Sequence, residues 1–274
     1  AIGKKVMRAA AENLTPITLE LGGTTPAIID SSANLREAAQ AIVYGKLLNG
    51  GQTCIAPDYV LIEANQQEAL IQELRSAAQT QFSNPDELTG PIDERQLHFW
   101  QHLVSDAISR GANLIPLLEN PKAGARRFEP LVMTNVSADC AILQEEIFGP
   151  ILPILTIKDT DAAVKFINER PHPLALYWFG KNKKHMHKVL NETLSGGVTI
   201  NDTLLHITID DLPFGGVGAS GMGKYHGKEG FDTFSHQKSV LDVKGFMGIN
   251  LFKGTTVARP PYGKKVEWLL RYLK

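Results

Sequence analysis

The chain has 274 residues, 43% of them hydrophobic and 21% charged, and its formal net charge is −1. These values are ordinary for a soluble globular protein of one or two domains, and the charge gives no reason to expect a nucleic acid or an anionic membrane as a partner. No apolar run is long enough to span a bilayer. The chain starts at Ala1 within an amphipathic pattern, which indicates a fragment or a processed form.

The cysteine content indicates the compartment. The two cysteines, Cys54 and Cys140, are too few for a disulfide framework, and no Cys/His cluster has the spacing of a zinc site. We therefore expect a reducing, cytoplasmic environment and no metal.

Helical and strand-like segments alternate along the chain. Helices are expected over 4–13, 67–81, 161–168 and 183–194. Two further helices are expected from their caps. One begins after Asn34 and ends at Gly50-Gly51, and the other begins after Asp93 and has Leu97, Trp100, Val104 and Ile108 on its inner stripe. Expected strands cover 16–21, 27–29, 59–62, 131–133, 151–157, 174–179 and 198–200. This alternation predicts an α/β fold with a largely parallel sheet.

The last third of the chain has a different composition. Residues 212–230 hold too many glycines for a helix or strand interior, so a shaped loop is expected there. The tail ends in a predicted short amphipathic helix over 264–273.

Cys54 follows the sequence Asn49-Gly50-Gly51-Gln52-Thr53. Glycines just before a cysteine let backbone N–H groups approach the group that the sulfur attacks, so an exposed thiol here suits a nucleophile. The alternative is a buried structural cysteine, and Cys140 has only that interpretation.

Two carboxylates are candidates for chemistry. Glu20 ends an apolar strand before Gly22-Gly23, where partial burial would raise its pKa and suit a general base; a surface glutamate is the alternative. Glu146 can accept two hydrogen bonds from a ribose diol, and Phe148 can bound a nicotinamide pocket; the alternative is a helix end with a core phenylalanine.

These segments, taken together, resemble the ordered signature blocks of the aldehyde dehydrogenase superfamily. The blocks are Leu19-Glu20-Leu21-Gly22-Gly23, Gly51-Gln52-Thr53-Cys54, Glu145-Glu146-Ile147-Phe148-Gly149-Pro150 and Pro213-Phe214-Gly215-Gly216. Each block alone is weakly or moderately specific, whereas their common order and spacing are highly specific. The extensions 54–60 and 221–228 are similar to the class three branch, most of all to bacterial coniferyl-aldehyde-type enzymes, and the resemblance covers the chain to about Val243.

The resemblance implies a role for each matching position. Cys54 is the nucleophile and Glu20 the base that activates water. Asn201 and Phe214 line the substrate pocket. The implied cofactor, NAD or NADP, is bound by Glu146, Phe148, Gly3, Leu21 and Gly22.

The implied organisation is a remnant of the cofactor-binding domain (1–22), a catalytic domain (23–212), a glycine-rich loop region (213–234) and a dimerisation strand with the C-terminal tail (235–274). Most of the N-terminal Rossmann-like cofactor domain, with its oxyanion-binding asparagine, is not in this chain. We therefore expect the chain alone to be inactive, residues 1–22 to be poorly ordered or packed on a neighbour, and Glu20 to lie far from Cys54.

Rival functions remain at this stage. An acylating dehydrogenase would pass the thioester to coenzyme A, but Glu20, a base for water, argues against it. A cysteine acyl-transferase or hydrolase would need no nicotinamide, but Glu146 and Phe148 argue against that. A dimerising module without activity is the third alternative. The implied partners are a small aldehyde and a second copy of the chain, paired through a strand over 236–243.

Overall fold

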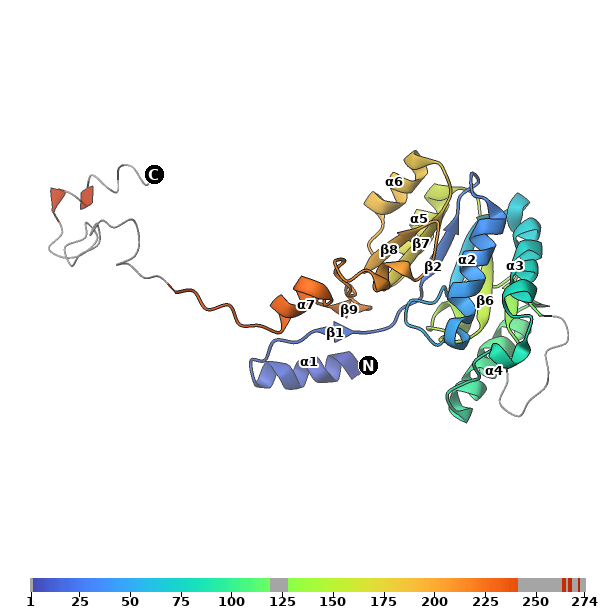
Figure 1. The fold of residues 1–274 in the computed structure, drawn as a ribbon, viewed down its shortest axis with the longest axis horizontal. Coiled ribbons are helices and arrows are strands. Elements are labelled where there is room, and N and C mark those ends of the chain that lie inside the picture. Colours follow the sequence, from blue (N-terminus) through green and yellow to red (C-terminus); the bar gives the residue numbers. More distant parts are fainter. Residues whose placement is uncertain (1, 119–127, 241–262, 265, 268–270, 272–274) are drawn as a thin grey trace. The chain divides into compact units, whose positions relative to one another are not determined.

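The computed structural model describes residues 2–118, 128–240, 263–264, 266–267 and 271. They belong to two compact units, residues 1–234 and 235–274 (Figure 1). The first unit contains the sheet and all the candidate site residues.

A seven-stranded sheet organises the first unit, in the spatial order β4-β5-β6-β3-β2-β7-β8. Its strands are β2 (Pro26–Ile29), β3 (Tyr59–Glu63), β4 (Asn113–Pro116), β5 (Leu131–Thr134), β6 (Ile151–Ile157), β7 (Ala175–Phe179) and β8 (Gly197–Ile200). All neighbouring pairs are parallel except β4 and β5. The predicted α/β fold with a largely parallel sheet is confirmed, and β4 is the antiparallel edge strand that the sequence analysis missed.

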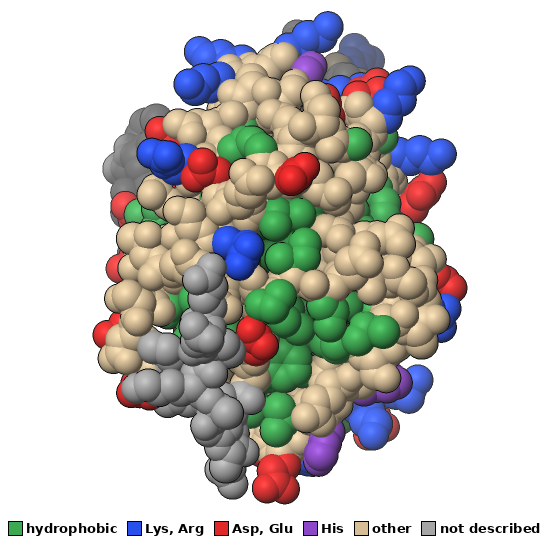
Figure 2. Space-filling view, turned by 90° about the vertical axis from the view of Figure 1, so that its right-hand side faces the viewer, with side chains coloured by type: hydrophobic (Ala, Val, Ile, Leu, Met, Phe, Trp, Pro, Cys, Tyr) green, Lys and Arg blue, Asp and Glu red, His purple; other side chains and the backbone are tan. Residues whose placement is uncertain are grey.

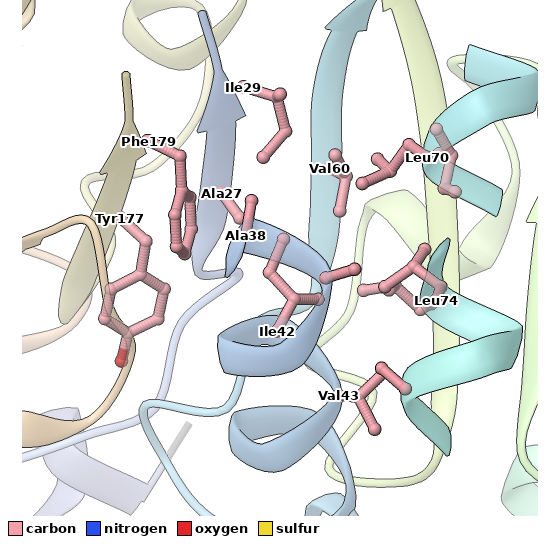
Figure 3. Packing of buried hydrophobic residues seen from close by; sticks show 14 of the residues in the cluster. Ala27, Ile29, Ala38, Ile42, Val43, Val60, Leu70, Leu74, Tyr177 and Phe179 are labelled. Atoms are coloured by element: carbon pink, nitrogen blue, oxygen red, sulfur yellow. The ribbon is translucent and has the colours of Figure 1, made fainter. Parts of the chain in front are cut away.

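Helices cover both faces of the sheet (Figure 1). They are α2 (Leu35–Leu47), α3 (Gln67–Gln81), α4 (Glu94–Ser109), α5 (Thr160–Asn168) and α6 (Lys183–Glu192). Ala27 and Ile29 of β2 pack in the cluster with α2 and α3, as Figure 3 shows, whereas Ile28 packs in the cluster with α4, α5 and α6. Both faces are buried because successive strand side chains point to opposite sides.

Helix α2 leads directly to the cysteine loop. Its N-cap is Asn34, as predicted, whose side-chain oxygen accepts hydrogen bonds from the backbone N–H groups of Arg36 and Glu37. The helix ends at Leu47, and the following 3₁₀ segment contains Asn49 and Gly50 with φ of 52° and 63°. These left-handed residues reverse the chain before Cys54.

The inner stripe of α4 differs from the prediction. The helix buries Trp100, Leu103 and Ala107, whereas Ile108 is 48% exposed. The prediction was wrong for Ile108, whereas Val104 is partly buried and packs against the core. Leu103 at i+3 and Ala107 at i+7 from Trp100 complete the face toward the sheet.

The glycine-rich segment is not a loop throughout. It contains β9 (Gly221–Met222) and the start of α7 (Gly227–Thr233). The two residues of β9 pair antiparallel with β1 (Leu19–Glu20), so part of the predicted loop serves as a partner for the strand that carries Glu20.

The N-terminal segment is ordered on its own chain. Helix α1 spans Ile2–Glu12, and β1 buries Leu19 through its pairing with β9. Leu19 was expected to be hidden on a neighbour but is buried within its own chain, because the glycine-rich segment supplies the hydrogen bonds that β1 needs. Packing of the apolar face of α1 on a neighbour stays a prediction. Val6 of α1 stays 44% exposed.

The second unit offers little to compare. Residues 235–240 form no helix or strand in the single chain, and the rest of the strand predicted over 236–243 lies outside the described residues. Most of the helix predicted over 264–273 lies outside them as well. The dimerisation strand stays a prediction.

On the face in Figure 2, Lys and Arg side chains lie mostly toward the edge, together with Asp and Glu side chains. Apolar side chains gather near the centre of this face. Within the described part of the chain, no helix is both long and apolar enough to cross a membrane.

The burial pattern of α4 gives a stability prediction. Leu103→Ala should lower the free energy of unfolding by about 2–5 kcal/mol, because it leaves a cavity in the core, whereas the matched change Ile108→Ala should cost less than about 1 kcal/mol. Urea unfolding followed by circular dichroism measures both. Equal losses, or a larger loss for Ile108→Ala, would contradict the observed helix register.

Candidate active site

The candidate site residues lie mainly on loops that enter the sheet. Gly22 and Gly23 precede β2, Cys54 precedes β3, and Glu146 precedes β6. Strands β2, β3 and β6 are parallel neighbours, so their amino ends lie at the same edge of the sheet. The topology thus brings together three segments that are far apart in the sequence.

Glycines allow these loops to approach at backbone distance. A Cβ on Gly51 would lie 2.4 Å from the carbonyl oxygen of Gly149, and a Cβ on Gly22 would lie 1.6 Å from Oε2 of Glu146. Gly51 also has φ of 75°, which other residues rarely adopt. A side chain at either position would separate the loops.

The thiol of Cys54 is partly buried, and the backbone N–H groups of Cys54 and Ile55 donate hydrogen bonds to its sulfur. Burial raises its pKa, and the negative charges of Glu146 and Glu20 raise it further. The sulfur is therefore protonated at neutral pH in the chain alone. Cys140, in contrast, is fully buried in the core under the opposite face of the sheet.

Glu20 lies close enough to Cys54 for its charge to raise the pKa of the thiol. Its carboxylate accepts a hydrogen bond from the backbone N–H of Gly216, and partial burial raises its own pKa, as expected for a base. The expected separation of Glu20 from Cys54 was wrong, because pairing of β1 with β9 holds Glu20 within the first unit.

Glu146 is half-buried beside the glycines that precede β2. Burial and the charge of Asp58 raise its pKa to about 7, against the lowering effects of the Gly23 N–H and the Lys46 ammonium. A carboxylate near its titration point at neutral pH is sensitive to any nearby charge.

Phe148, two residues later, has φ of 44°, a strained conformation for an aromatic residue. The indole N–H of Trp100 and the side-chain amide of Gln96 hold it there by donating to its carbonyl oxygen, at 3.2 and 3.1 Å.

The other cofactor candidates adjoin Glu146. A Cβ on Gly3 would lie 3.0 Å from Leu21 Cδ1, and the backbone N–H of Leu21 donates to the carbonyl oxygen of Ser220 at 3.1 Å. Gly3, Leu21, Gly22 and Glu146 thus form a continuous strip, in which the Leu21 side chain lies against Gly3 and the Glu146 carboxylate lies against Gly22. A carboxylate beside such a strip fits a ribose diol. The described residues contain no group of three His, Cys, Asp or Glu placed to hold a metal ion.

The two substrate-pocket candidates have different surroundings. Phe214 is buried in the core cluster against which Cys54 packs, and its ring stacks between His206 and His226 at centroid distances of 5.9 and 5.4 Å. Asn201 follows β8, at the carboxyl ends of the strands, where its side-chain oxygen accepts a hydrogen bond from the Gly180 N–H at 2.8 Å. The structure places Asn201 at the other edge of the sheet from the Cys54 loop.

Sequence analysis missed three residues of this region. Tyr225 lies near enough to Glu20 and Cys54 for their charges to raise its pKa, after the larger effect of burial. Asp58 and Lys46 are buried beside Glu146. Helical spacing could have revealed Lys46, because it follows Ile42 by four residues and so falls on the buried stripe of α2.

Comparison with known proteins agrees with this arrangement. A family model described as "Aldehyde dehydrogenase family" matches residues 1–240. The chain is 47% identical to a "Probable coniferyl aldehyde dehydrogenase" of Pseudomonas aeruginosa, over 98% of this chain and 56% of the relative. It is 45% identical to "Aldehyde dehydrogenase family 3 member A2" of Mus musculus, over 100% of this chain and 55% of the relative.

Solved structures are similar as well. The substrate-bound AldH of Staphylococcus aureus superposes with a TM-score of 0.85 at 38% identity, covering 100% of this chain and 58% of that one. An NAD-dependent aldehyde dehydrogenase of Sinorhizobium meliloti gives a TM-score of 0.76 at 30% identity, over 86% and 48%. The chain spans about half the length of the relatives it matches.

The environment of the two thiols gives a prediction for the chain alone. Iodoacetamide should modify Cys54 and leave Cys140 unmodified, because only Cys54 is partly accessible. The rate should rise with pH through a midpoint above the usual cysteine value. In Glu146→Gln this midpoint should fall, because one of the charges that disfavour the thiolate is removed. Mass spectrometry identifies the modified site; preferential labelling of Cys140, or a midpoint that Glu146→Gln leaves unchanged, would refute the assignment.

Proposed function

We propose, from the premise that this chain belongs to the aldehyde dehydrogenase family, that it carries the catalytic half of an NAD(P)-dependent enzyme that oxidises an aldehyde to a carboxylic acid. The observation that supports this most is the electrostatic coupling of Cys54 to both Glu20 and Glu146. A nucleophile, a base for water and a cofactor-binding carboxylate are the groups that such a reaction needs in one place.

The first step is the attack of the Cys54 sulfur on the aldehyde carbon, which gives a thiohemiacetal. Because burial and nearby negative charges raise the pKa of the thiol, it must lose its proton before it attacks. The backbone N–H of Cys54, which donates to the sulfur in this structure, would turn to the oxyanion once the sulfur has attacked.

The second step turns the thiohemiacetal into a thioester by loss of hydride. NAD(P)⁺, when bound, accepts that hydride. Glu146 would hold its ribose, Phe148 would bound its nicotinamide pocket, and Gly3, Leu21 and Gly22 would line the cofactor side of the site. Glu20 then takes a proton from water, which attacks the thioester, and the Cys54 sulfur leaves with the acid released.

The substrate class follows from the relatives. Several of them are named for coniferyl aldehyde, an aromatic substrate. We propose an aromatic aldehyde of this kind, or a medium-chain aliphatic one, for the parent enzyme. The aromatic rings of Phe214, His206, His226 and Tyr225, packed beside the Cys54 cluster, support an apolar substrate.

The rival functions fit the site less well. Transfer of the acyl group to coenzyme A gives no use to Glu20, which lies beside Cys54 with a raised pKa. A hydrolase without nicotinamide gives no use to the strip that joins Gly3 to Glu146. We further propose that the chain alone oxidises no aldehyde, because it spans only about half the length of the relatives it matches.

The role of Glu20 can be tested in a longer enzyme that contains both this chain and the additional segment that its relatives have. Glu20→Gln should keep the rapid formation of NAD(P)H in the first turnover and slow the steady state by about 10²–10⁴-fold, because only deacylation needs the base. Rapid mixing with absorbance detection measures both phases. Cys54→Ala is the control and should show neither phase. Loss of the burst in Glu20→Gln would instead assign Glu20 to the first chemical step.

The dimer can be tested through the exposed residue Val240, which is 81% exposed in the single chain. If residues 236–243 pair with a second copy, Val240→Lys should weaken dimerisation at least about tenfold, because the charge must be desolvated on pairing. Sedimentation velocity across a concentration series measures the dissociation constant. Ile92→Lys, at another exposed apolar position (80%), is the control. A wild-type chain that stays monomeric, or equal effects of the two changes, would contradict the proposed strand.

A further inference from the structure

Lys46 is an unusual residue for the interior of a protein. It lies in the last turn of α2 with only 1% of its surface exposed, and its Nζ has no hydrogen-bond partner. A buried ammonium is costly unless opposite charges compensate for its lost hydration. The carboxylates of Asp58 and Glu146 supply that compensation.

Asp58 is fixed in place by the loops around it. Its Oδ2 accepts a hydrogen bond from the Thr25 N–H at 2.8 Å, and its Oδ1 accepts one from the Ile147 N–H at 3.2 Å. Asp58 is itself 3% exposed. Because both oxygens are engaged by rigid backbone, the negative charge beside Lys46 cannot move away.

We propose that Lys46 is a positioning residue for the cofactor side of the site: its buried ammonium, in the last turn of α2 near the fixed carboxylate of Asp58, holds the negative charge on Glu146. Lys46 acts on the reaction through Glu146 and touches neither aldehyde nor cofactor. The inference rests on the proposed function only for the identity of the group that Glu146 binds, which is the cofactor ribose.

The charge balance of the cluster explains why Lys46 is needed. Asp58 and burial both favour the neutral form of Glu146, and a neutral carboxyl group accepts hydrogen bonds from a diol less well than a carboxylate. The opposing groups are the Gly23 N–H and the Lys46 ammonium. Reciprocally, the two carboxylates support the charge on Lys46, whose pKa burial lowers to about 8. The charges of Cys54 and Glu146 disfavour each other, so Lys46 also influences the thiol indirectly.

The test is a carboxyl titration of the 274-residue chain by carbon-13 NMR, with Glu146→Gln used to assign the Glu146 signal. In Lys46→Met, which keeps the volume and removes the charge, the Glu146 midpoint should rise by at least about one pH unit from about 7. Lys46→Arg keeps the charge and should leave the midpoint near the wild-type value. Lys165→Met, at an exposed position of α5, should leave it unchanged.

Two results would overturn the inference: an unchanged midpoint in Lys46→Met, or an equal shift in Lys46→Arg, which would indicate packing rather than charge. If Lys46→Met fails to fold, the reciprocal measurement decides. Nitrogen-15 NMR of Lys46 should show a midpoint near 8 that falls further in Glu146→Gln, because a favourable charge is lost. An unchanged Lys46 midpoint would refute the coupling. No cofactor or aldehyde is present, so failure of the proposed function would appear separately, as an absence of NAD(P) binding in the longer enzyme.

Discussion

The carboxylate of Asp58 is the contact on which the site depends. Through its hydrogen bonds to the N–H groups of Thr25 and Ile147, it joins the loops that enter β2, β3 and β6 at one point. An unpaired backbone N–H in a buried position costs about 1–3 kcal/mol, so these loops separate only at a considerable penalty. Cys54 lies four residues before Asp58, and Glu146 lies one residue before Ile147. The geometry of this junction therefore constrains the distance between the proposed nucleophile and the proposed cofactor-binding carboxylate.

The junction also explains why chemistry lies at the amino ends of the strands. In open parallel sheets, ligands commonly bind beyond the carboxyl ends, where loops lead into helices. Here the carboxyl edge holds a structural cluster, in which Asp30 pairs with Ser32 and His185 and anchors the start of α6. The amino edge instead has loops reversed by left-handed residues, such as Asn49 and Gly51, and these loops meet backbone to backbone. That close contact leaves a surface of peptide N–H groups and carboxylates.

The sequence was sufficient for features that depend on local periodicity or on local motifs. Gln67–Gln81 has the predicted bounds and buries the predicted residues Leu70, Leu74, Ala77 and Ala78, because one apolar stripe alone determines that face. The sequence was insufficient where the structure of a segment depends on a partner that is distant along the chain. The partner of Leu19–Glu20 is a two-residue strand inside a glycine-rich segment, and neither has a recognisable pattern alone. The buried face of α4 likewise depends on the sheet that it packs against, and the edge strand β4 depends on its pairing with β5. Motif matches brought Cys54, Glu20 and Glu146 to the same site, but Asn201, placed by motif alone, lies at the carboxyl edge.

The residues that no motif indicated are the ones that set the charge of the site. Three acidic groups converge on Cys54: Glu20 and Glu146 directly, and Asp58 through Glu146. Without compensation, burial and the charge of Asp58 would favour the protonated form of Glu146, which is a poorer acceptor for a diol than the carboxylate. Among the described residues, Lys46 is the basic side chain whose charge acts on Asp58 and Glu146, and it is buried beneath them. An exposed ammonium at this position would occupy surface that a ligand could use, whereas a buried one lowers the electrostatic cost and leaves that surface free. The burial of Lys46 is therefore consistent with a catalytic site that must keep acidic groups close together and still ionise one of them.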